Sequence, residues 1–116
     1  MVLELFEPAF DFALKATNRP VVMAFVADWC PHCQALKPQL AAVARDYRSK
    51  VQTWAINVDH APNLSPVFAF DGVPVLVAFH GGQPVWRQVG SVEPSVLAKM
   101  YESLVARGTQ PITPMW

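Results

Sequence analysis

The sequence lacks the features that mark several large classes of protein. It has only two cysteines among 116 residues, and its nine basic and nine acidic residues cancel to a net charge of zero. Two cysteines are too few to staple a disulfide-rich secreted scaffold. Balanced charge predicts neither a nucleic-acid-binding surface nor an acidic tail. No apolar run is long enough to span a bilayer, so we expect no membrane association.

The N-terminal segment also lacks the basic stretch and apolar core of a signal peptide. We therefore expect a cytoplasmic protein, or a periplasmic one from which a leader has been removed. A hydrophobic fraction of 53% in 116 residues predicts one domain with a sizeable core, which we place at residues 1–108. Residues 109–116 carry two prolines and no periodicity, and are predicted to form an irregular tail.

Short apolar runs alternate with segments of helical periodicity along the chain. The apolar runs predict strands at residues 2–6, 21–27, 51–58, 73–80 and 84–89. Gly81-Gly82 predicts a hairpin turn between the last two strands. Apolar spacing of three and four predicts a helix that begins at Pro8 and further helices at residues 31–48, 64–70 and 94–108. This order predicts an α/β fold with a mixed central sheet sandwiched between helices.

Both cysteines lie in the stretch Trp29-Cys30-Pro31-His32-Cys33, directly after a predicted strand. Pro31 suits the first turn of a helix, so Cys30 is predicted at a helix N-terminus, where unpaired backbone N–H groups favour a thiolate. The pattern predicts a redox couple in which Cys30 attacks and Cys33 resolves. We expect His32 to donate to the Cys30 sulfur or to place positive charge near it, which would stabilise the reduced form.

Metal binding is the main alternative for the cysteine pair. Two cysteines at this spacing are half of a tetrahedral zinc site, and His60 and His80 could in principle complete it. These histidines lack the paired ligand spacing of structural zinc sites, so we expect no metal. Attachment of a c-type haem is excluded, because Gln34 and not histidine follows Cys33.

The chain resembles the thioredoxin family over residues 2–107, in its motifs, order of elements and spacing. The resemblance rests on the motif at residues 29–33, on Pro38 inside the following helix, on Gly72-Val73-Pro74-Val75 and on Gly90. It implies a thioredoxin fold and thiol–disulfide exchange with protein substrates, in cell redox homeostasis and electron transport. It also implies recycling by a separate reductase or oxidase and no cofactor, and we expect a monomer. Pro38 should kink its helix.

The resemblance further implies a substrate groove beside the cysteines. Trp29 and Gly90 are expected to line this groove. Val73-Pro74 matches a cis-proline loop that faces the disulfide, and the Val73 backbone is expected to pair with an extended substrate segment.

The chain departs from the family pattern at two charged positions and in the motif itself. The family's buried aspartate, which assists proton transfer to the second cysteine, falls at Ala24, and its partner lysine falls at Ala55. Pro31-His32 is typical of bacterial disulfide oxidases of the same superfamily, but this chain is too short for their inserted helical domain. We expect a more oxidising couple with slower proton loss from Cys33. Two alternatives are a dedicated disulfide donor or isomerase in an oxidising compartment, and a thioredoxin-like binding module with an idle dithiol.

Overall fold

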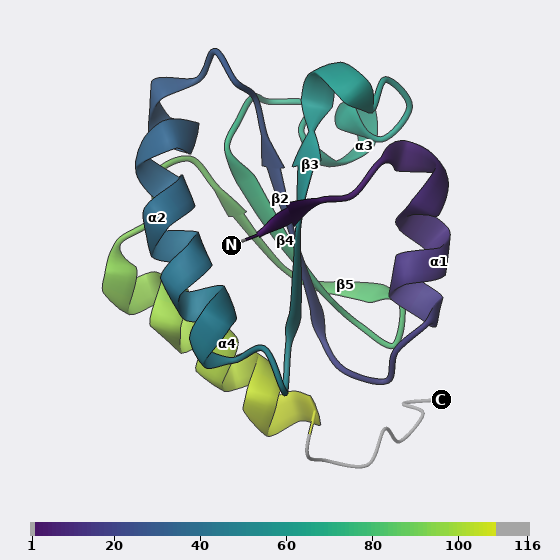
Figure 1. Ribbon diagram of the computed structural model, residues 1–116, viewed down its shortest axis with the longest axis vertical. Coiled ribbons are helices and arrows are strands. Elements are labelled where there is room, and N and C mark those ends of the chain that lie inside the picture. Colours follow the sequence, from purple (N-terminus) through teal and green to yellow (C-terminus); the bar gives the residue numbers. More distant parts are fainter. Residues whose placement is uncertain (1, 109–116) are drawn as a thin grey trace.

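The computed structural model describes residues 2–108 (Figure 1). Within this range the strands are β1 (Leu3–Glu4), β2 (Val21–Val26), β3 (Gln52–Asn57), β4 (Val75–His80) and β5 (Gln83–Val89). The helices are α1 (Phe10–Lys15), α2 (Pro31–Asp46), α3 (Ser65–Phe68) and α4 (Pro94–Gly108), with short 3-10 turns at Glu7–Ala9 and Val58–His60. In this described part of the chain, no helix combines the length and the apolar character that crossing a membrane requires.

The strands form one mixed sheet in the order β1-β3-β2-β4-β5. β1, β2 and β3 run parallel, whereas β4 is antiparallel to β2 and β5 is antiparallel to β4. α2 and α4 cover one face of the sheet and α1 and α3 the other (Figure 1). Gly81 and Gly82 join β4 to β5 with φ values of 61° and 80°, which glycine adopts without strain. The predicted α/β fold with a mixed sheet between helices is confirmed.

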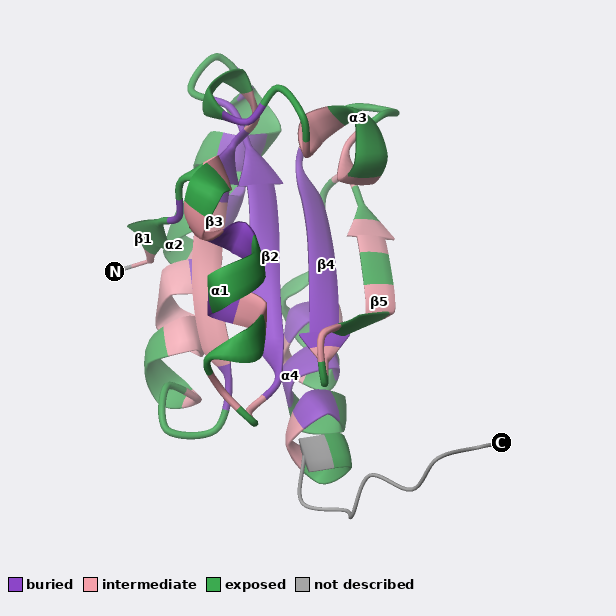
Figure 2. Ribbon diagram, turned by 90° about the vertical axis from the view of Figure 1, so that its right-hand side faces the viewer, coloured by how far each residue is buried: buried purple, intermediate pink, exposed green. Residues whose placement is uncertain are grey.

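The central strands anchor the fold because they are buried on both faces. β2 is buried along its whole length, and β4 is buried up to Phe79 (Figure 2). Successive side chains of a strand point to opposite faces. Val22, Ala24 and Val26 accordingly belong to the buried cluster under α2 and α4, while the alternate residues of β2 belong to the cluster that contains Phe10. The carboxyl end of β2, where the cysteine motif begins, is therefore held from both sides.

Several predicted boundaries differ from the structure by a few residues. β4 begins at Val75 and not at residue 73, because Pro74 has no N–H to donate to a strand ladder. α2 contains Pro38, as predicted, but ends at Asp46, after which the Tyr47 carbonyl accepts hydrogen bonds that turn the chain toward β3. α3 is shorter than predicted. The tail predicted at residues 109–116 lies outside the described residues, so the domain boundary stays a prediction.

Candidate active site

Cys30 and Cys33 lie at the start of α2, directly beyond the carboxyl end of β2. Both are free thiols. Cys30 is the N-cap residue, with an extended backbone (φ −95°, ψ 114°), and Pro31 occupies the first turn. The Cys30 Sγ accepts a hydrogen bond from the Cys33 backbone N–H at 3.3 Å. This N–H is one of the donors that a helix N-terminus leaves without a partner, so α2 stabilises negative charge on the Cys30 sulfur.

The loop before β4 lies against Cys30. The Cys30 thiol donates to the Val73 carbonyl oxygen, which is 3.7 Å from the sulfur, and the Val73–Pro74 peptide bond is cis. Gly90, directly after β5, has a φ of 82° and donates its N–H to the Pro74 carbonyl oxygen at 2.8 Å. The structure thus brings Cys30, Val73, Pro74 and Gly90 together from three separate parts of the sequence.

The two thiols differ in their surroundings. Cys30 keeps 4% of its surface exposed, and Cys33 keeps none. Burial raises the pKa of the Cys33 thiol to about 11, and its hydrogen bond with Cys30 acts in the same direction. Cys33 is therefore protonated at neutral pH. Cys30 is the sulfur that an incoming disulfide can reach.

His32 lies between the cysteines in sequence, but its hydrogen bond is made elsewhere. The residue is exposed, and its Nδ1 is 3.0 Å from the Ser91 Oγ, in the segment between β5 and α4. Within residues 2–108 no hydrogen bond joins the His32 ring to the Cys30 sulfur, because that sulfur is engaged by backbone groups of Cys33 and Val73. The direct donation from His32 to Cys30 is therefore not made in this structure, which holds Cys30 as a thiol. The effect of a positive ring nearby stays a prediction.

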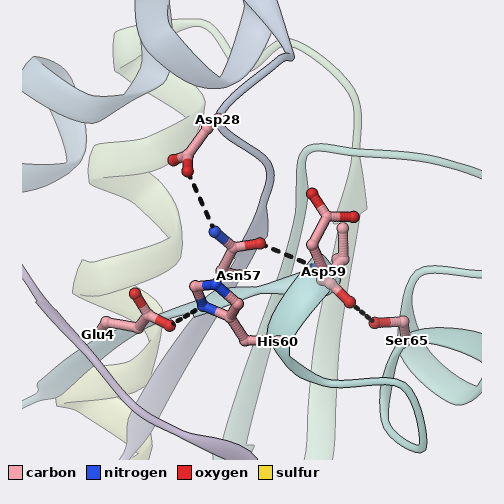
Figure 3. A network of polar contacts seen from close by, with 7 residues as sticks. Glu4, Asp28, Asn57, Asp59, His60 and Ser65 are labelled. Atoms are coloured by element: carbon pink, nitrogen blue, oxygen red, sulfur yellow. Dashed lines mark hydrogen bonds and ion pairs between the residues drawn. The ribbon is translucent and has the colours of Figure 1, made fainter.

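A polar network on the β3 side of the site holds Trp29. The Trp29 side chain is largely exposed, at 67%, yet its indole N–H donates to the Asp59 Oδ2 at 3.0 Å. Asn57 positions Asp59, because the Asn57 Oδ1 accepts the Asp59 backbone N–H at 2.9 Å (Figure 3). The Asn57 Nδ2 donates to the Asp28 Oδ2 at 3.5 Å. Trp29 is thus fixed at the surface beside Cys30.

Sequence reasoning missed Asp59 and Asn57, since it gave neither residue a role in the site. One signal could have found them. Both residues lie at or just after the end of β3, as Trp29 follows the end of β2, and these neighbouring strands run parallel. The carboxyl ends of parallel neighbours meet at the same edge of a sheet. Polar residues at these two strand ends are therefore expected to lie together.

The structure gives no support to the zinc alternative. His60 follows β3 and His80 ends β4, and these strands run in opposite directions, so the two histidines lie at opposite ends of the sheet. The His60 Nδ1 is 2.7 Å from the Glu4 Oε2 (Figure 3), and this hydrogen bond raises the pKa of His60. Across residues 2–108, no group of three or more His, Cys, Asp or Glu side chains could hold a metal ion.

A dithiol at a helix N-terminus, with one reachable sulfur and one buried sulfur, defines the class of protein. It can pass two electrons to a partner and become a disulfide, which is the chemistry of a thiol–disulfide oxidoreductase. The chain belongs to the thioredoxin family, whose model matches residues 1–103.

Curated relatives agree with this assignment. The chain is 30% identical over 91 residues to the thioredoxin of Buchnera aphidicola subsp. Schizaphis graminum, a match that covers 78% of this chain and 84% of that protein. It is 36% identical over 101 residues to the thiol:disulfide interchange protein TxlA of Synechococcus elongatus, covering 84% of this chain and 53% of the other. It is 29% identical over 105 residues to the bifunctional thioredoxin reductase/thioredoxin of Mycobacterium leprae, covering 90% and 23%. The protein is a thiol–disulfide oxidoreductase.

Proposed function

We propose that the chain reduces disulfides in protein substrates through a mixed disulfide at Cys30, which Cys33 resolves. In the first step the Cys30 thiolate attacks one sulfur of the substrate disulfide, and the other sulfur leaves as a thiolate that takes up a proton. In the second step Cys33 gives its proton to solvent and attacks the Cys30 sulfur. The bond between Cys30 and the substrate breaks, and the Cys30–Cys33 disulfide forms. The substrate gains two electrons and the protein loses two.

The unequal burial of the two sulfurs carries this proposal. Cys30 retains some exposed surface and its sulfur accepts a helix N-terminal N–H, whereas Cys33 has no exposed surface. Only Cys30 can meet a bulky disulfide without opening the structure. Cys33 lies three residues further along the same helix, and its backbone N–H already contacts the Cys30 sulfur, so it is placed to attack an adduct there.

The surface around Cys30 fits an extended protein segment. Trp29 and Val89 are exposed, at 67% and 42%. The Gly90 N–H, at the end of β5, donates a hydrogen bond to the Pro74 carbonyl oxygen in the loop that carries Val73. The Val73 carbonyl lies beside the Cys30 sulfur, so a substrate main chain can pair with it while the substrate sulfur reaches Cys30. Trp29 and Val89 would supply apolar contact on either side.

Variants of the two cysteines test the proposal. Wild-type protein, kept reduced by dithiothreitol, should catalyse reduction of insulin disulfides, and both Cys30→Ser and Cys33→Ser should lose turnover. Only Cys33→Ser should accumulate mixed disulfides with insulin, because its Cys30 adduct has no internal attacker. Equal recovery of adducts from Cys30→Ser would overturn the assignment. An inactive wild type would favour the idle binding module.

The oxidised form would be recycled by a thioredoxin reductase in a reducing compartment, for which we propose the cytoplasm. The name of the Mycobacterium leprae relative joins a thioredoxin reductase and a thioredoxin in one protein, which supports a reductase as the electron donor. The reduction potential, measured by equilibration with glutathione, distinguishes this from a disulfide donor. A value below the poise of the cytosolic glutathione pool supports reduction of substrates. A value well above that poise, as strong disulfide donors have, contradicts it.

A further inference from the structure

A pocket of about 380 Å³ opens beside α2, on the face of the sheet that α2 covers. Its lining is almost wholly apolar: Val2, Ala24, Val26, Leu36, Lys37, Pro38, Leu40, Ala41 and Ala55. Two of these residues, Ala24 and Ala55, stand where the family pattern places an aspartate and a lysine. Among the described residues that line the pocket, Lys37 is the only one with a charge. The described lining of the pocket therefore contains one cationic side chain, from α2, and no charged side chain from the sheet.

Lys37 lies one helical turn after Cys33. Both residues are on α2, four positions apart, and side chains at this spacing lie on the same side of a helix, roughly 6 Å apart at Cβ. The Lys37 side chain is exposed, and no ion pair engages it within residues 2–108. Its positive charge is thus not neutralised by a protein carboxylate, and it stands near a fully buried thiol.

Within residues 2–108, no carboxylate from the other elements acts on the Cys33 thiol. The buried cluster that contains Cys33 draws apolar side chains from β2, β4 and α4, namely Val22, Ala24, Val26, Leu76, Ala78, Leu97, Met100 and Leu104, with Ala55 of β3 packed against it. Tyr101 of α4 also belongs to this cluster, but its hydroxyl pairs with the Thr53 Oγ1 at 2.7 Å and burial raises its pKa, so it is neutral. Tyr47 packs at the edge of the cluster.

Within residues 2–108, the charges that act on the Cys33 thiol come from Cys30 and Lys37, and no carboxylate contributes. Cys30 raises the pKa of Cys33 and Lys37 lowers it. A cation stabilises a nearby thiolate, so these directions agree with the signs of the charges. A hydrogen bond with the Ala27 backbone also lowers the pKa of Cys33, and among the described residues Lys37 is the side chain that lowers it through charge.

We propose that Lys37 is a positioning residue for the resolving step: its ammonium group stabilises the thiolate of Cys33 as that sulfur attacks the mixed disulfide at Cys30. It acts from α2, in place of charged groups on β2 and β3. This inference rests on the proposed role of Cys33 as the resolving thiol. Lys37 takes no part in bond making. The proton of Cys33 leaves to solvent, and the displaced substrate thiolate takes up a proton in turn.

A two-phase reaction with a chromogenic disulfide isolates this step. When reduced protein reacts with dithiobis(nitrobenzoate), attack by Cys30 releases one coloured thiolate, and attack by Cys33 on the adduct releases a second. The rate of the second phase as a function of pH reports the fraction of Cys33 present as thiolate. In Lys37→Gln the midpoint of this profile should rise by about 0.3 to 1 pH unit, which slows the second phase about two- to tenfold below the midpoint.

Matched variants separate charge from shape. Lys37→Arg keeps the cation and should keep the wild-type midpoint. Lys99→Gln removes a cation from an exposed position on α4 and should also leave the midpoint unchanged. The proposal is overturned if the Lys37→Gln profile superimposes on that of the wild type, if Lys37→Arg is displaced as far as Lys37→Gln, or if Lys99→Gln moves the midpoint equally. Absence of a second phase in the wild type would instead contradict the resolving role of Cys33.

Discussion

The Trp29 side chain is exposed yet held in place by Asp59. Replacing Asp59 by alanine should leave the indole exposed but no longer held. The indole N–H donates to the Asp59 carboxylate at 3.0 Å, and Asn57 fixes the backbone of Asp59. Asp59→Ala removes the acceptor while leaving Trp29 and both cysteines in the chain. The free protein would then have a mobile indole, which a protein substrate must order again when it binds.

The size of the effect follows from that ordering. Immobilising one side chain at an interface costs about 0.5–1.5 kcal/mol, which corresponds to a roughly two- to twelvefold lower kcat/KM for a protein substrate. A small disulfide does not cover Trp29, so its reaction with Cys30 should be unchanged. Asp59→Asn keeps an oxygen acceptor without the charge and should lose less than Asp59→Ala.

The assay compares insulin reduction with the first phase of the dithiobis(nitrobenzoate) reaction for wild type, Asp59→Ala and Asp59→Asn. Loss confined to insulin, and larger for alanine than for asparagine, is the expected pattern. Equal loss with both substrates would refute the reasoning, because Asp59 would then act on the chemistry at Cys30. An unchanged kcat/KM for insulin in Asp59→Ala would refute it as well, since Trp29 would need no support.

Three further outcomes are expected. The resolving step should accelerate about tenfold per pH unit above pH 7 and level off between pH 9 and 11, because burial raises the pKa of Cys33 from 9.0, whereas the further rise that the free Cys30 thiol causes is lost in the mixed disulfide. The second phase of the chromogenic reaction measures this, and a plateau below pH 9 would contradict it. Tyr101→Phe should lower the free energy of unfolding by about 1 kcal/mol, because it removes the buried hydroxyl that pairs with Thr53 at 2.7 Å; urea unfolding that matches wild type would argue against this. His32→Pro should make the couple more reducing by about 30 mV, a tenfold change in the exchange equilibrium, because a ring that can place positive charge near the Cys30 sulfur is lost. Glutathione equilibration measures the potential, and an unchanged or higher value would show that His32 does not stabilise the reduced form.

The local sequence pattern was sufficient to predict the order of strands and helices and the part of the site that contains the cysteines. β2 is an uninterrupted apolar run, and Pro31 marks the start of the next helix, so the order strand, Cys30, helix follows from neighbouring residues alone. Gly81 and Gly82 likewise identify the hairpin, because their left-handed φ values suit glycine. The strand ends were less accurate, because they depend on hydrogen bonds made after the chain folds.

The other half of the site depends on the order of strands in the sheet. Val73, Pro74 and Gly90 could be named only through the family resemblance, since nothing near them in sequence indicates that they meet Cys30. Asp59 was missed because its partner is thirty positions away, and the pairing requires β3 to lie beside β2. Ser91 was given no role in the site, whereas its hydroxyl lies 3.0 Å from the His32 Nδ1. Side-chain hydrogen bonds between residues far apart in the sequence produce no repeating pattern from which they could be predicted.

The Val73 carbonyl oxygen serves the resting protein and the proposed complex in turn. In the free molecule this oxygen accepts a hydrogen bond from the Cys30 thiol. A substrate main chain that pairs with Val73 uses the same oxygen, so docking competes with the hydrogen bond that the Cys30 thiol donates. Recognition and activation would then be one event, because the sulfur is freed only when a chain lies in register beside it. After the second step Cys30 is bonded to Cys33 and has no thiol hydrogen to donate, so its hydrogen bond to the Val73 carbonyl returns only when the protein is reduced again.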